Sequence, residues 1–170
     1  MLRIGLISDT HSHVDAKLTQ HFSDCNEIWH AGDFGNIDVV KNLEKIKPLT
    51  RGVYGNIDGA DIRILFPEHL VFEVEGLKIY ITHIGGYPGK YVARAKDIIK
   101  KEKPDIFICG HSHILRVMRD SDFNNMIVMN PGAAGKEGFH RVKTLLKFEL
   151  NNGKIENLKA IELGLRGSIE

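Results

Sequence analysis

The sequence predicts an α/β fold, built as a four-layer αββα sandwich in which two mixed β-sheets are flanked by helices. Short apolar runs rich in Ile, Val and aromatic residues alternate with amphipathic stretches as far as about Gly110. This alternation is typical of parallel strands joined by helical crossovers. Gly76, Asn124-Asn125 and Asn152-Gly153 lie between strand-like runs as hairpin turns, which adds antiparallel pairs to the sheets.

The expected strands are apolar runs of the length that strands favour, and the expected helices are the amphipathic stretches between them. The strands are Leu2–Ser8, Glu27–Ala31, Leu49–Tyr54, Leu70–Val74, Lys78–Thr82, Asp105–Cys109, Met126–Met129, Lys143–Leu150 and Lys154–Leu163. The helices are Ala16–Ser23, Asp38–Lys47 and Lys90–Lys103. The last helix ends in Lys-Glu-Lys before Pro104, because cations favour the negative end of the helix dipole and proline cannot continue a helix.

Length and charge narrow the class of protein. A chain of 170 residues, 42% hydrophobic, has the size of one globular domain, which we expect to span residues 1–170. With 23 Lys+Arg against 22 Asp+Glu, it lacks the basic surplus that holds a nucleic-acid backbone, so no stable nucleic-acid complex is expected. No apolar run approaches ~18 residues, which predicts no membrane span and a cytoplasmic protein. Cys25 and Cys109 are too few for a disulfide framework and predict buried thiols in a reducing compartment.

Polar side chains follow several of the expected strands at the point where each strand ends. The segments are Asp9-Thr10-His11, Gly32-Asp33, Gly55-Asn56, His83 and Gly110-His111-Ser112-His113. Because the carboxyl ends of parallel strands meet at one edge of a sheet, where ligands bind, these segments can converge on one pocket. A spacing of two residues, in Asp9/His11 and His111/His113, puts both members of each pair on one side of an extended segment.

The side chains in these segments are those that hard or borderline metal ions prefer. Two carboxylates, one amide and four imidazoles make the candidate ligand set: Asp9, His11, Asp33, Asn56, His83, His111 and His113. This set is too large for one tetrahedral ion and suits two ions that share a bridging carboxylate, and the absence of thiolates points to Mn, Fe, Zn, Ni or Co. Taken singly, each His also fits a hydrogen-bonded residue at a strand end, each Asp a helix N-cap, and Asn56 a turn residue.

The ordered set Asp-Thr-His, Gly-Asp, Gly-Asn, Thr-His and Gly-His-Ser-His resembles that of the calcineurin-like metallophosphoesterases. The short chain resembles in particular the small YfcE-type phosphodiesterases. Asn130-Pro131-Gly132-Ala133 is similar to the Asn-Pro-Gly-Ser stretch that such proteins carry. The resemblance runs from about Met1 to Gly135, and five motifs in the same order make it specific.

The resemblance implies a metal-dependent phosphoesterase, and more narrowly a phosphodiesterase that hydrolyses a small phosphate ester. It implies two divalent transition-metal ions, with manganese expected first and Ni, Zn, Fe or Co as alternatives. The first ion would be held by Asp9, His11, Asp33 and His113, and the second by Asp33, Asn56, His83 and His111, so that Asp33 bridges them. A hydroxide bound to this dinuclear metal centre would attack the phosphorus atom in line.

One position departs from the pattern of many relatives. They carry Gly-Asn-His-Asp/Glu, in which the His protonates the leaving oxygen, whereas this chain has Ile57 after Asn56. A general acid contributes ~10²–10⁴ in rate, so its loss predicts a preference for diesters or good leaving groups, or else a substitute donor. His13 is the nearest candidate donor in the sequence.

The remaining histidines fit supporting roles. His30, beside Trp29, is expected to pack beneath the site, where it could orient a ligand. His140, next to Arg141 in a glycine-rich loop, fits a phosphate contact and a solvated loop equally well.

Two other functions and the oligomeric state stay open. A protein-interaction module is one alternative, because the retromer subunit that resembles these enzymes has lost part of the ligand set, although this sequence retains it. A nuclease is the other, disfavoured by the near-neutral charge. A homo-oligomer is an alternative to a monomer, because Leu146, Phe148 and Leu150 alternate along a strand, a pattern that fits an exposed face and, better, a half-buried strand.

Overall fold

The computed structural model describes residues 1–47 and 50–167. The elements follow one another as β1 (Leu2–Ile7), α1 (Leu18–His21), β2 (Glu27–His30), α2 (Ile37–Ile46), β3 (Thr50–Gly52), α3 (Ala60–Leu65), β4 (His69–Val74), β5 (Leu77–Thr82), α4 (Ala93–Glu102), β6 (Ile106–Ile108), β7 (Leu115–Asp120), β8 (Met126–Pro131), β9 (Val142–Asn151) and β10 (Lys154–Leu165). A short 3-10 turn at Ser121–Phe123 precedes β8.

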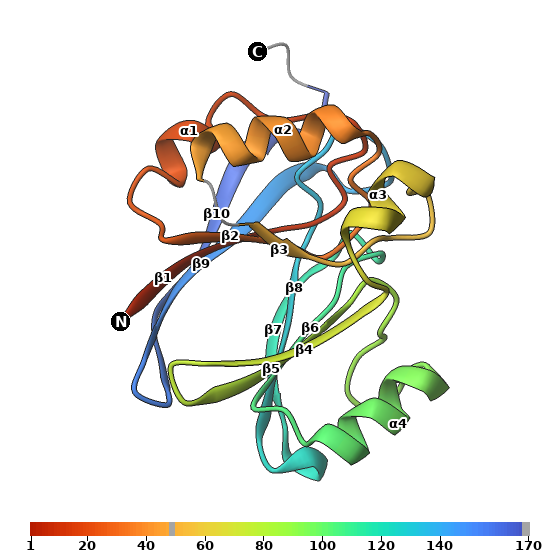
Figure 1. Cartoon of the computed structure of the whole chain (residues 1–170), viewed down its shortest axis with the longest axis vertical. Helices are drawn as coiled ribbons and strands as arrows, with labels where there is room; N and C mark the ends of the chain where they lie inside the picture. The colour runs from red at the N-terminus through yellow and green to blue at the C-terminus, as the bar shows by residue number, and fades with distance from the viewer. Residues whose placement is uncertain (48–49, 168–170) are drawn as a thin grey trace.

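The strands form two mixed sheets that pack face to face (Figure 1). The first has the order β10-β9-β1-β2-β3, and the second has the order β4-β5-β6-β8-β7. Within them, β1-β2, β2-β3, β5-β6 and β6-β8 are parallel pairs, and the other neighbours are antiparallel. The strand and helix alternation therefore predicted the parallel pairs correctly.

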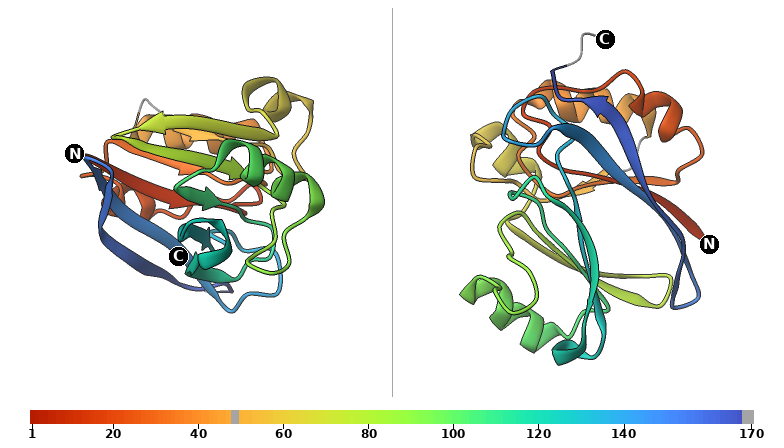
Figure 2. Two further views of the ribbon diagram at one scale, coloured as in Figure 1. Left: turned by 90° about the horizontal axis from the view of Figure 1, so that it is seen from below. Right: turned by 180° about the vertical axis from the view of Figure 1, so that it is seen from behind.

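Three apolar clusters separate four layers. Trp29, Ile79, Ile108 and Phe148 belong to the core between the two sheets. A second cluster lies between the first sheet and α1, α2 and α3, and a third lies between the second sheet and α4. Two further views show α1 and α2 over one sheet and α4 over the other (Figure 2). The predicted αββα sandwich is confirmed.

Turn and cap residues mark the bounds of several helices and strands at the positions that the sequence predicts. The Asn36 side chain accepts hydrogen bonds from the Asp38 and Val39 amides and so begins α2. Lys103 takes a left-handed conformation directly after α4, before Pro104. The predicted hairpin turns at Gly76, Asn124-Asn125 and Asn152-Gly153 all have positive φ angles. Leu146, Phe148 and Leu150 are buried in the core, so this face of β9 is not a free surface.

Two elements were missed in the sequence. The strand β7 is an edge strand whose side chains are mostly exposed, so it shows little hydrophobic alternation. The helix α3 buries Ile62 but leaves Ile64 and Leu65 exposed, which blurs its amphipathic pattern.

Two helices are shorter than expected. α4 begins at Ala93 rather than Lys90, because the amides of Lys90 and Val92 bond to the loop residues Tyr87 and Gly85. α1 is a single turn, because the Asp15 side chain accepts from the Lys17 amide and holds the preceding residues in a turn. The predicted strand Leu49–Tyr54 is shorter, at Thr50–Gly52, and Leu49 lies outside the described residues.

Within residues 1–47 and 50–167, no helix has the length and apolar character needed to span a bilayer.

Candidate metal centre

The predicted ligands come together at the carboxyl ends of strands from both sheets. Asp9, Asp33 and Asn56 follow β1, β2 and β3 of the first sheet. His83 and the His111-Ser112-His113 segment follow β5 and β6 of the second. The parallel pairing places these ends side by side, and the packing of the two sheets brings the two sets of loops face to face.

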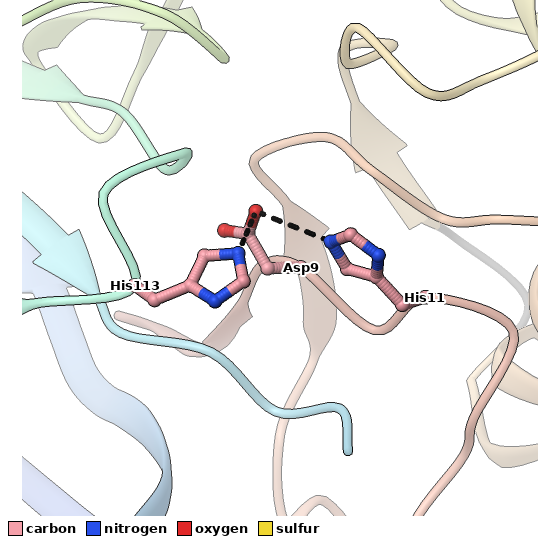
Figure 3. A group of neighbouring side chains, drawn as sticks. All are labelled: Asp9, His11 and His113. Atoms are coloured by element: carbon pink, nitrogen blue, oxygen red, sulfur yellow. Dashed lines mark ion pairs between the residues drawn. The ribbon is translucent and has the colours of Figure 1, made fainter. Parts of the chain in front are cut away.

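The first cluster consists of Asp9, His11 and His113, whose ligand-type atoms all lie within 4.8 Å of one another. Both imidazoles point at the same carboxylate oxygen of Asp9 (Figure 3). His113 Nε2 lies 3.1 Å from Asp9 Oδ1, and His11 Nε2 lies 3.9 Å from it. The arrangement offers one oxygen and two nitrogens toward a common point.

The second cluster consists of Asp33, His83 and His111. His83 Nε2 lies 3.1 Å from Asp33 Oδ2. The fourth predicted member of this group, Asn56, is beside them, with its Oδ1 atom 3.1 Å from His111 Nδ1. The structure thus brings all the predicted ligands into two adjacent groups.

Asp33 lies between the two groups. Its Oδ2 atom is 3.4 Å from His11 Nε2 of the first cluster and 3.1 Å from His83 Nε2 of the second. The carboxylate therefore faces imidazoles of both clusters, as a bridging ligand would.

In both Asp9 and Asp33, one carboxylate oxygen faces the imidazoles and the other accepts hydrogen bonds from neighbouring residues. Asp9 Oδ2 accepts hydrogen bonds from Ser8 Oγ at 2.6 Å and from the His111 amide at 3.1 Å. Asp33 Oδ1 accepts from the Ile57 amide at 3.1 Å. These bonds fix the rotation of both carboxylates, so that Oδ1 of Asp9 and Oδ2 of Asp33 point at the imidazoles.

The backbone of the site differs from the extended segments expected for Asp9/His11 and His111/His113. These four residues and Asp33 all have positive φ angles, between 45° and 66°. Left-handed backbone costs of order 1–3 kcal/mol for each residue other than glycine, and such residues cluster at functional sites. The side chains converge because the chain turns sharply after each strand, and not because alternate residues share a face.

Charge within the clusters is strongly coupled. Burial raises the pKa of the Asp9 and Asp33 carboxyls, but the neighbouring imidazoles outweigh it and hold both pKa values far below their usual range. In turn, the carboxylates of Asp33 and Asp9 raise the pKa of His11 to about 9. Burial lowers the pKa of His83, yet the same carboxylates outweigh it and raise that pKa. A divalent cation bound between these groups would compete with protons for them.

The unpaired atoms of the site fit a metal ion. Among the described residues, Asp9 Oδ1, His11 Nε2 and His83 Nε2 are buried side-chain atoms without a hydrogen-bond partner. Leaving such atoms unpaired costs about 1–3 kcal/mol each. All three face the inside of the two clusters, and oxygen and imidazole nitrogen are ligands of divalent transition metals.

Two pockets border the second cluster. A pocket of about 440 Å³ is lined by Asn56 and His83 and by the cations Arg63 and Arg94. A more apolar pocket of about 220 Å³ has His111 in its wall. Its lining also includes Tyr87 and Arg116, whose guanidinium lies 4.1 Å from the centre of the Tyr87 ring. A larger cavity of about 960 Å³ lies at the amino ends of β5, β6 and β8, and no candidate ligand lines it.

Two residues that hold the ligand loops were not predicted from the sequence. The Asp58 carboxylate accepts from the amides of Gly35 and Gly55 and so joins two of the ligand loops. Asn130 donates to the Gly110 carbonyl and to Ser112 Oγ, which holds the segment that carries His111 and His113. The Asn130-Pro131-Gly132 resemblance was a signal for Asn130, and the place of Asp58 two residues after Asn56 was a weaker one.

The remaining predictions concern residues around the clusters. His30 is fully buried beneath the site, where its Nε2 lies 2.9 Å from Thr10 Oγ1 and its Nδ1 accepts from the Gly32 amide. His13 is half-buried two residues beyond His11. His140 has both ring nitrogens engaged within the chain. Cys25 and Cys109 are buried free thiols, as expected.

Comparison with known proteins gives the family. A family model described as the calcineurin-like phosphoesterase superfamily domain matches residues 2–153. A phosphodiesterase of Methanocaldococcus jannaschii is 30% identical over 146 residues, which cover 77% of this chain and 83% of the relative.

Solved structures share the fold. An archaeal phosphodiesterase superposes with a TM-score of 0.76 at 24% identity and covers 95% of this chain and 99% of its own. Vps29 of Entamoeba histolytica, solved with Zn²⁺, superposes with a TM-score of 0.70 at 17% identity and covers 96% of this chain and 100% of its own. The match of the family model, over most of the chain and all of the candidate ligands, shows that this protein belongs to the calcineurin-like phosphoesterase superfamily.

Proposed function

We propose that this protein is a metal-dependent phosphodiesterase that hydrolyses a small phosphate ester. The observation that carries the proposal is the pair of ligand clusters, Asp9-His11-His113 and Asp33-His83-His111, on either side of one carboxylate. The similarity to the phosphodiesterase of Methanocaldococcus jannaschii supports the same activity. The two pockets beside the second cluster suit the two substituents of a diester.

Two divalent ions would complete the site. The first would be held by Asp9, His11, Asp33 and His113, and the second by Asp33, Asn56, His83 and His111. Manganese is the proposed metal, with Zn, Ni, Fe or Co as alternatives, because the donors are oxygen and imidazole nitrogen. The complex of Entamoeba histolytica Vps29 with Zn²⁺ supports a metal at this fold.

Ions held by these residues would supply Lewis-acid chemistry, namely activation of a water molecule for in-line attack on phosphorus and neutralisation of charge on the phosphoryl oxygens. Residues around the clusters hold the candidate ligands in position. Ser8 and the Ile57 amide hold the carboxylates of Asp9 and Asp33, and Asn130 holds the His111 segment. Arg63, in the wall of the larger adjacent pocket, would bind a second anionic group of the substrate, whereas Arg94 in the same wall is paired with Glu68.

Protonation of the leaving group has no obvious donor beside Asn56. Ile57 stands in the position after Asn56 and is exposed, so it offers no proton. We assign this step to His13, which is half-buried and lies in the same loop as His11. If His13 does not donate, the substrate is expected to be a diester or an ester with a good leaving group.

A protein-interaction module is the second candidate, because Vps29 structures share this fold. The full set of candidate ligands favours the enzyme. A nuclease acting on long polymers is disfavoured by the near-neutral charge. We further propose that the chain acts as one catalytic domain in the cytoplasm, without a stable nucleic-acid complex, and leave a homo-oligomer as an outcome for measurement.

The test compares a diester and a monoester of the same chromophore, with added Mn²⁺ or with a chelator. Turnover of the diester with Mn²⁺, abolished by the chelator, is expected. Asp33→Asn and His111→Ala should each lower the rate by more than about a hundredfold, because the metals supply several kcal/mol of transition-state stabilisation. His21→Ala, at the end of α1, is the control and should retain the rate. No turnover with any of the five metals would refute the enzyme and leave the interaction module.

A further inference from the structure

His140 lies in the loop between β8 and β9 and contacts one of the candidate ligands directly. Its Nδ1 atom is 3.2 Å from Nδ1 of His113, and the two rings meet edge to face with their centres 5.1 Å apart. Its Nε2 atom is 2.8 Å from the carbonyl oxygen of Gly135. Both nitrogens of this half-buried ring are therefore engaged.

The partners determine where the protons lie. A carbonyl oxygen only accepts, so Nε2 of His140 must donate to Gly135. In the neutral ring this leaves Nδ1 of His140 as an acceptor. The Nδ1 atom of His113 then carries the proton between the two rings. In the neutral His113 ring, the Nε2 atom, which faces Asp9, has the lone pair. That lone pair is the form of imidazole that binds a metal.

Contacts of the loop 135–141 hold His140 against His113. The Gly135 amide donates to the Asp9 carbonyl at 3.0 Å, so the accepting carbonyl of Gly135 is tied to the ligand loop. Gly138 has a φ of 120°, and a Cβ there would lie 2.2 Å from His113 Nδ1. Arg166 donates from its side chain to the Gly138 carbonyl and from its amide to the Arg141 carbonyl. The backbone at Gly138 thus packs against the His113 ring.

We infer that His140 is a positioning residue that fixes the tautomer and the ring orientation of His113 for metal binding, an inference that rests on the proposed function of the site. In the second cluster the tautomer of His83 is fixed by a backbone carbonyl. Nδ1 of His83 lies 2.7 Å from the Ala31 carbonyl oxygen, which can only accept a hydrogen bond. His140 accepts only because Gly135 binds its other nitrogen. The affinity of the first ion therefore depends on the loop 135–141, far from its ligands in sequence.

The experiment uses two substitutions of similar size. His140→Leu removes the acceptor, whereas His140→Gln keeps it, because the amide oxygen can accept from His113 while the amide nitrogen donates to Gly135. His21→Leu, outside the site, is the control. Zn²⁺ and Mn²⁺ affinities are measured by calorimetry. In the Zn²⁺-loaded and metal-free wild type, nitrogen NMR measures the coupling between Nδ1 of His113 and Nδ1 of His140 across their hydrogen bond.

We expect that coupling in the wild type, with the proton on His113. We expect His140→Leu to weaken one of the two ions by about 10–100-fold and His140→Gln to stay close to the wild type. Equal affinity of His140→Leu and the wild type, equal loss in both variants, or absence of the coupling would overturn the inference. If the wild type shows the coupling but binds no ion, the proposed function fails while the contact between the two rings stands.

Discussion

His83 Nδ1 lies 2.7 Å from the carbonyl oxygen of Ala31, and this hydrogen bond joins the carboxyl end of β5 in one sheet to that of β2 in the other. It also turns the opposite nitrogen of His83 toward Asp33. The same contact therefore links the carboxyl ends of the two sheets and orients a ligand of the second cluster.

Gly32→Ala should disturb this contact. A Cβ at position 32 would lie 2.6 Å from His83 Nδ1 and would push the ring away from Ala31 and Asp33. We expect metal affinity, measured by calorimetry, to fall by about 10–100-fold. Gly89→Ala is the matched control, because Gly89 also has a positive φ but has open space around it. Equal effects of the two substitutions would show that backbone strain alone is responsible.

His13→Ala should separate substrates by their leaving groups. If His13 donates the proton, the variant loses about 10²–10⁴ in kcat on esters of poorly acidic alcohols and keeps its rate on aryl esters, whose leaving groups need no proton. A series of diesters with leaving groups of increasing pKa measures this as a steeper dependence of log kcat on pKa. Unchanged activity on the poorest leaving group would exclude His13 as the donor.

His30 should make the protein sensitive to acid. Burial lowers the pKa of this imidazole to about 3, from about 6.5 in the unfolded chain. Between these values the unfolded state binds a proton that the folded state does not, so His30 lowers the free energy of unfolding by about 1.4 kcal/mol for each pH unit below 6.5. Above pH 6.5 this penalty is absent.

Urea titrations of wild type and His30→Gln between pH 7 and 4 test this dependence. The stability advantage of the wild type over the variant should shrink as the pH falls. A difference for His30→Gln that does not change with pH would contradict the expectation.

Lys143→Met should destabilise the fold. Lys143 Nζ lies 2.7 Å from Asp15 Oδ2, and both side chains are completely buried. Removing one member of a buried ion pair leaves an uncompensated charge, which costs about 3–5 kcal/mol. The double variant Lys143→Met/Asp15→Asn removes the charge and keeps an acceptor for the Lys17 amide, so it should recover part of that loss in chemical denaturation. A double variant less stable than Lys143→Met would refute the explanation.

The sequence predicted the layers, and it predicted which candidate ligands lie together, because both rest on local signals. Apolar runs mark strands, and the short polar motifs after β1, β2, β3, β5 and β6 place the ligands at strand ends. The rule that parallel strands align their carboxyl ends then suffices to place Asp9 and Asp33 at one edge of the first sheet.

The missing features depend on contacts between distant segments. The left-handed backbone of Asp9 and His111 follows from the packing of opposing loops, which no periodicity records. The contact of His140 with His113 depends on where the loop 135–141 folds back. The edge strand β7 has mostly exposed side chains, so its pairing with β8 left no hydrophobic pattern to find.

The His111 amide donates to Asp9 across 102 residues of sequence, and His83 reaches Ala31 across 52. Both contacts join strand ends of one sheet to strand ends of the other, so they require the two sheets to be packed together. We therefore expect the site to form late in folding, once both sheets are in place. An ion that binds only this completed site would raise the free energy of unfolding by mass action.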